Sequence, residues 1–263
     1  MRIDLTGKQA VVSGSTAGIG YAIAAGLAGA GASVVVNGRS EGRVQDAVQR
    51  LRRQFGGAVT GHAADLATAE GAASLFAHVE DADILVNNLG IFEPKPFAEI
   101  SDADWQRFFE TNVMSGIRLS RHYVGGMVAR GWGRIVFISS ESALNIPKEM
   151  VQYGMTKTAQ LAVSRGLAES LAGTGVTVNA VLPGPTRSEG VAGFLKQMGA
   201  DEGQSPEQVE AEFLRANRPT SLLGRLADVE EVANMVVYAC SPQASATTGA
   251  ALRVDGGVVR FIA

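Results

Sequence analysis

Short runs rich in β-branched residues alternate along the chain with longer stretches in which apolar residues recur every three or four positions. The short runs predict strands, because each is dominated by small or branched apolar residues and ends near Gly, Asn, Ser or Pro. They cover residues 10–13, 33–37, 84–87, 134–139, 176–182, 251–254 and, more weakly, 58–62. The stretches between them predict helices over residues 19–30, 44–55, 102–130, 153–172 and 229–239.

Nearly every position in the stronger strands is apolar, which is typical of strands buried on both faces. Strands that alternate with helices favour right-handed crossovers into a parallel sheet. We therefore expect an α/β fold with a doubly wound, Rossmann-like parallel sheet of about seven strands and helices on both faces. No repeat or linker divides residues 1–263, so a single domain is expected.

Residues 186–225 break this rhythm, because Gly, Pro and charged residues are mixed through them. A long insertion after a strand at the carboxyl edge predicts a substrate lid, with an ordinary immobile helical excursion as the alternative. Five cations in it are free to meet an anionic substrate tail or solvent. They are Arg187, Lys196, Arg215, Arg218 and Arg225.

Charge and cysteine content exclude several classes of function. With 23 Lys and Arg against 26 Asp and Glu, the net charge is −3, so no basic surplus is available for nucleic acid. The one cysteine, Cys240, excludes an internal disulfide and a multi-thiolate metal site, and it favours a cytoplasmic location. No apolar stretch is long enough to span a membrane. His62, His78 and His122 are scattered, so no metal is predicted.

A glycine-rich segment joins the first predicted strand to the first predicted helix. Gly14 permits a sharp exit from the strand, Gly18 lets the backbone approach a diphosphate, and Gly20 allows close packing of helix on strand. The helix N-terminus then favours an anion. A tight turn is the alternative for glycines alone. The full segment is Gly14-Ser15-Thr16-Ala17-Gly18-Ile19-Gly20.

The end of the second strand bears on which dinucleotide would bind. No carboxylate follows this strand to accept a hydrogen bond from a ribose 2′-hydroxyl, whereas Arg39 offers donors suited to a 2′-phosphate. NADP(H) is therefore favoured, and NAD(H) stays open. After the third strand, Asp65 and the adjoining Leu66 predict either a contact with the adenine amino group or a helix N-cap.

A phenol and an ammonium lie four residues apart in the predicted helix 153–172. An ammonium about 4 Å from Tyr153, at an effective dielectric constant of about 20, favours the phenolate by roughly 4 kcal/mol, or about 3 pK units. Lys157 thus makes Tyr153 a usable proton carrier, unless the two form only a surface pair. Ser140 follows a strand at the carboxyl edge, where it can reach the same substrate oxygen. Asn112, in the predicted helix 102–130, offers an amide that can hold a water.

Together these features make the chain similar to the short-chain dehydrogenase/reductases of the single-domain type, over nearly its whole length. The residues that carry the resemblance are Gly14-x-x-x-Gly18-Ile19-Gly20, Asn87-Asn88-Leu89-Gly90, Asn112, Ser140, Tyr153, Lys157, Pro183-Gly184 and Asp255-Gly256-Gly257.

The resemblance implies a role for each catalytic candidate. Tyr153 is the acid/base, and Ser140 orients and polarises the reacting oxygen. Lys157 depresses the tyrosine pKa and binds the nicotinamide ribose, while Asn112 anchors a proton relay.

The resemblance also implies the cofactor contacts. Residues 14–19 cradle adenosine and diphosphate, Asn88 and Gly90 line the ribose channel, and Thr186 and Ser188 approach the carboxamide beside Pro183 and Gly184. Three positions depart from the family pattern. Ser13 and Leu89 stand where Thr and Ala are more common, and Ala17 stands where many NADP members carry a basic residue, so the case for a 2′-phosphate depends on Arg39.

The resulting hypothesis is an NADP(H)-dependent carbonyl reductase or alcohol dehydrogenase, with a 3-oxoacyl thioester as the first candidate substrate. The alternatives are a sugar, polyol or steroid alcohol dehydrogenase using NAD, and a non-catalytic dinucleotide-binding regulator. Family members usually form dimers and tetramers, so a homodimer or homotetramer is expected.

Overall fold

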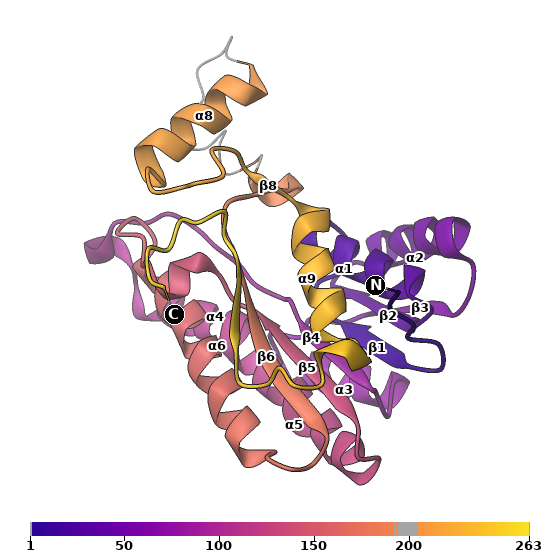
Figure 1. Ribbon diagram of the computed structural model, residues 1–263. Coiled ribbons are helices and arrows are strands. Elements are labelled where there is room, and N and C mark those ends of the chain that lie inside the picture. Colours follow the sequence, from indigo (N-terminus) through magenta and orange to yellow (C-terminus); the bar gives the residue numbers. More distant parts are fainter. Residues whose placement is uncertain (1, 192, 194–204, 263) are drawn as a thin grey trace.

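The fold is built around seven parallel strands, shown by a computed structural model that describes residues 2–191, 193 and 205–262. Their spatial order is β3-β2-β1-β4-β5-β6-β9 (Figure 1). Each predicted strand overlaps one of them, so the predicted doubly wound sheet is confirmed. The strands are β1 (Gln9–Val12), β2 (Ser33–Gly38), β3 (Val59–Ala63), β4 (Ile84–Asn87), β5 (Gly133–Ile138), β6 (Val176–Pro183) and β9 (Ala251–Val254).

Helices cover both faces of this sheet because successive strand residues point to opposite sides. Val12, Val34 and Val36 pack in a core with α1 (Gly18–Gly29), α2 (Glu41–Phe55) and α9 (Val229–Ala239). Val11 and Val35 belong to a second core on the other face, with α3 (Ala69–His78), α5 (Ser115–Ala129) and α6 (Val151–Ser170). Burial on both faces explains why these strands carry apolar residues without polar alternation.

The predicted helix 102–130 is not continuous. It consists of α4 (Asp102–Phe109), a π-helical turn over Glu110–Met114 and α5. Single π-helical turns occur often at functional sites, and this one contains Asn112. The prediction also missed α3, which begins after Thr68, whose hydroxyl accepts a hydrogen bond from the Gly71 amide. Three-residue 3₁₀ turns cover Phe97–Glu99, Glu141–Ala143 and Pro242–Ala244.

The segment predicted as a lid contains three described elements. β7 (Thr186–Arg187) pairs in parallel with β8 (Ala227–Asp228) in a small separate sheet. Helix α8 (Pro206–Asn217) projects beyond the main body (Figure 1). Residues 192 and 194–204 lie outside the described part of the chain, and the lid stays a prediction.

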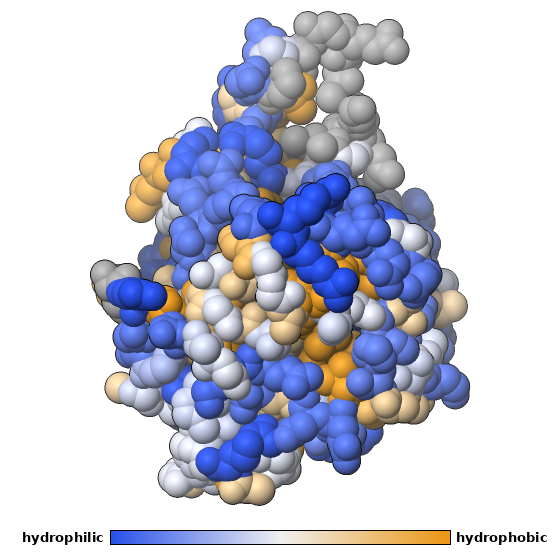
Figure 2. Space-filling model, turned by 90° about the vertical axis from the view of Figure 1, so that its right-hand side faces the viewer, coloured by the Kyte–Doolittle hydropathy of each residue, from blue (hydrophilic) through white to orange (hydrophobic). Residues whose placement is uncertain are grey.

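The surface over the first strands is mainly hydrophilic, with hydrophobic residues in a band near its centre (Figure 2). Among the described residues, no helix combines the length and apolar character needed to cross a membrane.

Candidate active site

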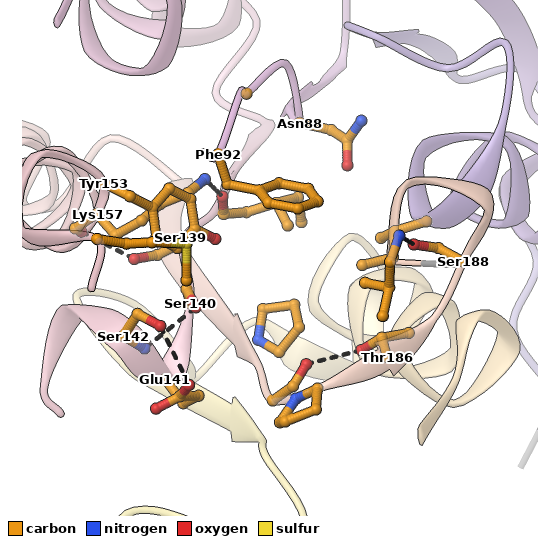
Figure 3. A pocket seen from close by; sticks show the side chains of 18 of the residues that line it. Asn88, Phe92, Ser139, Ser140, Glu141, Ser142, Tyr153, Lys157, Thr186 and Ser188 are labelled. Atoms are coloured by element: carbon orange, nitrogen blue, oxygen red, sulfur yellow. Dashed lines mark hydrogen bonds between the residues drawn. The ribbon is translucent and has the colours of Figure 1, made fainter. Parts of the chain in front are cut away.

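A cavity of about 270 Å³ lies at the carboxyl edge of the sheet. Ser140, Tyr153 and Lys157 lie on one wall, where β5 ends and α6 begins, while Thr186 and Ser188 lie across from them (Figure 3). The parallel sheet creates this arrangement, because the carboxyl ends of its strands all open on the same edge.

The three side chains on the first wall are brought together as the spacing predicts. Tyr153 lies in the first turn of α6, and Lys157 follows one turn later with its Nζ 5.5 Å from the centre of the Tyr153 ring. A hydrogen bond joins the Ser140 side chain to the Tyr153 phenol. Lys157 is only 4% exposed, so the alternative of a surface pair does not describe this site.

The electrostatics of the site differ from the prediction. Burial raises the pKa of Tyr153 to about 12, and the hydrogen bond with Ser140 offsets this rise only in part. Burial also lowers the pKa of Lys157 to about 7. The expected lowering of the tyrosine pKa by Lys157 is therefore wrong for this protein. The lysine Nζ is directed at the Ile138 carbonyl, 2.8 Å away, and its burial weakens the positive charge on which the prediction relied.

Asn112 is fully buried and does not line the cavity. Its Oδ1 accepts from the Ile91 amide at 2.8 Å, and its Nδ2 donates to Thr156 Oγ1 at 2.9 Å. The predicted water-holding amide is thus already bonded to protein. Asn112 is linked to Lys157 through Gln160, a residue that the sequence analysis missed. Gln160 Nε2 donates to the backbone carbonyl of Asn112 at 2.5 Å, and Gln160 Oε1 accepts from Lys157 Nζ at 3.3 Å.

Gln160 was in principle detectable. It follows Lys157 by three residues, and residues so spaced share one face of a helix. Its relation to Asn112, 48 positions away, depends on the packing of α6 against the π-helical turn.

The glycine-rich segment forms a close-packed cradle. Gly14 and Gly18 have positive φ angles of 61° and 56°, which favour glycine. A Cβ at Gly20 would lie 2.4 Å from Asn88 Nδ2 and 2.4 Å from the Gly14 carbonyl oxygen. Asn88 Nδ2 itself donates to that carbonyl at 2.9 Å, so the strand, the turn and the helix are joined at one point.

Members of the cradle divide into those that line a cavity and those that build the turn. Ala17, Ile19 and Gly20 line the catalytic cavity, but Ser15 and Gly18 line neither of the two cavities described here. The Ser15 hydroxyl is buried and donates to the Val12 carbonyl at 2.7 Å. Ser13 is one of the three positions that depart from the family pattern. Its hydroxyl accepts hydrogen bonds from the backbone amides of residues 88 and 89, and these bonds stabilise the turn.

A second cavity adjoins the first through Ala17, which lines both. Its lining includes the predicted cofactor residues Gly14, Thr16, Arg39, Asp65 and Leu66. It also includes Arg43, in the first turn of α2, which the sequence analysis missed although it stands only four residues after Arg39. Two arginines therefore line this cavity, where the sequence analysis expected one.

The other residues near this cavity have structural partners. Asn37, near the end of β2, is buried and accepts from the Gly14 amide through Oδ1 at 3.3 Å. The alternative of Asp65 as a helix N-cap is wrong, because Thr68 caps α3 and Asp65 accepts from the Ala67 amide at 3.1 Å.

The far wall of the catalytic cavity is formed by the end of β6 and the residues that follow it. Pro183, Gly184, Thr186 and Ser188 all line it, as the resemblance implies. A Cβ on Gly184 would lie 2.7 Å from the Asp255 carbonyl oxygen, so this wall packs closely on the Asp255 turn. Gly90, from the opposite side, also lines the cavity.

These adjoining cavities fit an extended dinucleotide. The glycine cradle lies where the two cavities adjoin, and its glycines leave no room there for larger side chains. The arginines line the second cavity and offer hydrogen-bond donors, while the phenol of Tyr153 lines the first. Anionic diphosphate oxygens would face the N-terminus of α1, whose free backbone amides favour them.

A buried ion pair in the cavity wall was not predicted. Arg218 Nε lies 2.7 Å from Glu141 Oε1, although the two residues are 77 positions apart. Arg187 and Arg225, two other cations of the segment 186–225, pair with the carboxylates of Glu210 and Glu231 instead. Arg215 is exposed, and Lys196 lies outside the described residues.

The histidines are less scattered than the sequence suggests. His62 stacks on His78 with ring centres 4.6 Å apart, and His122 stacks on Phe76 at 3.9 Å. In the described part of the chain, no three His, Cys, Asp or Glu side chains gather in a group able to hold a metal ion.

Comparison with known proteins places this geometry in a family. Residues 14–259 match the short-chain dehydrogenase model described as "Enoyl-(Acyl carrier protein) reductase". The chain is a short-chain dehydrogenase/reductase. It is 49% identical over its full length to the uncharacterized oxidoreductase YvaG of Bacillus subtilis (strain 168), which it also covers completely. It is 34% identical to the 3-oxoacyl-[acyl-carrier-protein] reductase FabG of Aquifex aeolicus (strain VF5), with 98% of this chain and 100% of the relative covered.

Solved structures of the family share the same fold. The L-sorbose reductase of Gluconobacter frateurii, complexed with NADPH and L-sorbose, superposes with a TM-score of 0.92 at 33% identity, with 100% of each chain covered. This short-chain dehydrogenase/reductase is accordingly an NAD(P)-dependent oxidoreductase that acts on a small molecule.

Proposed function

We propose that this enzyme reduces the carbonyl group of a small substrate with NADPH, and that it oxidises the corresponding alcohol in reverse. The observation that carries the proposal is the common wall of Ser140, Tyr153 and Lys157, which adjoins an arginine-lined second cavity through the glycine cradle. The retained phenol, hydroxyl and lysine argue against a non-catalytic regulator.

The proposed reaction needs one proton and one hydride. A reduced nicotinamide, when bound, would supply the hydride for the carbonyl carbon. Tyr153 gives its phenolic proton to the carbonyl oxygen, so that a ketone, NADPH and a proton yield an alcohol and NADP⁺. The raised pKa of Tyr153, about 12, keeps the phenol protonated at neutral pH, as an acid for carbonyl reduction must be.

The neighbouring groups position this acid. Ser140, hydrogen-bonded to the phenol, holds the substrate oxygen beside it. Lys157 would hold the nicotinamide ribose, and its own position is maintained by Ile138 and Gln160. Asn112 supports this group through Gln160 rather than by direct contact with the cavity.

The preference for NADP(H) rests on Arg39 and Arg43. Both line the second cavity, where a 2′-phosphate attached to the adenosine ribose would meet two guanidinium groups. The structural neighbour in complex with NADPH supports the same preference. A homodimer or homotetramer and a cytoplasmic location stay predictions.

The test is consumption of NADPH or NADH by the purified protein, followed by nicotinamide absorbance, with a panel of ketoses, 3-oxoacyl thioesters and steroid ketones. We expect at least one carbonyl to be reduced, with higher kcat/KM for NADPH than for NADH. Reactions without substrate measure background oxidation. Tight binding of NADPH without consumption by any carbonyl would contradict the proposal.

A further inference from the structure

The Glu141–Arg218 pair lies in the wall of the catalytic cavity, next to the residues that would hold the reacting oxygen. Glu141 directly follows Ser140, and both members of the pair line the cavity together with Tyr153. Glu141 is 2% exposed and Arg218 is 6% exposed. Arg218 immediately follows α8, so the pair joins the segment after β6 to the end of β5.

Stability alone does not explain such a pair. Removing two charges from water costs several kcal/mol for each ion, and an apolar pair of similar volume is often equally stable or more stable. Polar groups in an otherwise apolar cavity usually fix the orientation of a ligand. The apolar part of this lining includes Phe92, Met150 and Phe213.

Both partners retain hydrogen-bonding capacity. Glu141 Oε1 accepts from Arg218 and from the Ser142 hydroxyl, whereas its Oε2 is buried without a partner among the described residues. Arg218 donates through Nε to Glu141 and through Nη1 to the Asn217 carbonyl, and no described residue bonds to its Nη2. Each member of the pair thus keeps one polar atom without a partner among the described residues, beside the cavity that both residues line.

The surrounding charges disfavour an anionic ligand. Glu149 Oε1 lies 3.7 Å from Arg218 Nη1, so the guanidinium faces two carboxylates and has no surplus positive charge. A substrate carboxylate or phosphate would gain little attraction here. A hydroxyl suits the wall better, because it donates to a carboxylate and accepts from a guanidinium.

We propose that Glu141 and Arg218 determine substrate specificity and select a neutral polyhydroxylated ketone of the sugar class, or its polyol in the reverse direction. The reacting carbonyl lies at Ser140 and Tyr153, and hydroxyl groups beside it donate to Glu141 and accept from Arg218. This inference rests on the proposed carbonyl reductase activity and ranks the 3-oxoacyl thioester behind the ketose. A site built to bond a hydroxyl disfavours analogues without it, because its own polar groups are then left unpaired.

The test compares kcat/KM for three probes with NADPH: L-sorbose as a ketohexose, 2-hexanone as a ketone without hydroxyl groups, and a 3-oxoacyl thioester. We expect the wild type to prefer the ketohexose over 2-hexanone by about 100-fold or more. The double variant Glu141→Gln, Arg218→Met leaves neither charge buried alone, and it should lower this ratio by about 10-fold or more. Arg215→Met, an exposed position on α8, is the matched control and should preserve the ratio.

Binding of NADPH, followed by its fluorescence, checks that each variant is folded. A wild type that prefers 2-hexanone or the thioester overturns the specificity role of the pair, as does an unchanged ratio in the folded double variant. In both cases the carbonyl reductase activity still stands. A wild type that reduces no carbonyl overturns the proposed function itself, and this inference with it. Because the wild-type preference is measured first, the inference is tested even if the double variant does not fold.

Discussion

Replacing Arg39 and Arg43 by alanine is expected to weaken the binding of NADPH while leaving the binding of NADH nearly unchanged. Both arginines line the second cavity, and Arg43 is largely exposed, with its guanidinium 3.7 Å from Glu189. Two unit charges 4 Å apart attract by about 1 kcal/mol in water and about 4 kcal/mol at an effective dielectric constant of 20. For such exposed groups, each arginine should contribute about 1–2 kcal/mol toward a 2′-phosphate, or about 5- to 30-fold in Kd.

The assay is titration with each cofactor, followed by nicotinamide fluorescence, for the wild type, both single variants and the double variant. The Kd for NADH divided by the Kd for NADPH should fall in each single variant and further in the double variant. Added salt should reduce these differences between the variants and the wild type. Arg53→Ala is the control, because Arg53 is exposed in the last turn of α2, the helix that also contains Arg43. An unchanged ratio in the double variant would refute the assignment of the 2′-phosphate to these arginines.

Three further predictions concern the cradle and the buried lysine. Gly20→Ala should strongly reduce NADPH affinity, because its Cβ would lie 2.4 Å from Asn88 Nδ2, whereas Gly42→Ala, with no neighbour within 4 Å, should not; equal affinities in a titration would contradict this. Lys157→Met should be more stable than the wild type at about pH 7, and this difference in the free energy of unfolding should shrink as pH rises toward 10.5. Burial lowers the pKa of Lys157 in the folded protein to about 7, so over that range the folded wild type no longer carries a buried charge while its unfolded chain is still protonated. Urea unfolding at about pH 7 and about pH 9 measures the difference, and a pH-independent gap would count against the burial argument. Gln160→Leu should lower kcat by roughly 10-fold with little change in KM and should alter the pH profile of kcat, because Lys157 loses a positioning partner; an unchanged profile would assign Gln160 a purely structural role.

The sheet was predictable because its signal is local. Runs such as residues 33–37 are apolar on both faces, and each ends at a residue suited to a turn. Helix α3 was missed because it is short and buries only Ala72 and Leu75. The interruption contains Asn112, whose side chain donates hydrogen bonds to Ile91 and Thr156, and neither partner is near it in the sequence.

The candidate site was predictable in its membership but not in its electrostatics. Spacing along α6 was enough to bring Tyr153 and Lys157 together. The sign of the tyrosine pKa shift depends on burial, which the spacing of two residues does not contain. The pairing of Glu141 with Arg218 likewise requires the path of the chain after β6, because nothing near either residue in the sequence indicates its partner.

The central claim is that the Tyr153 phenol delivers the proton while a bound nicotinamide delivers the hydride. The most direct test is the single-turnover rate of NADPH oxidation in the wild type and in Tyr153→Phe, with a substrate that the wild type reduces and with NADPH affinity measured in parallel. The account predicts a rate lower by roughly 100-fold or more in the variant, at nearly unchanged affinity. A variant that turns over at the wild-type rate would contradict it.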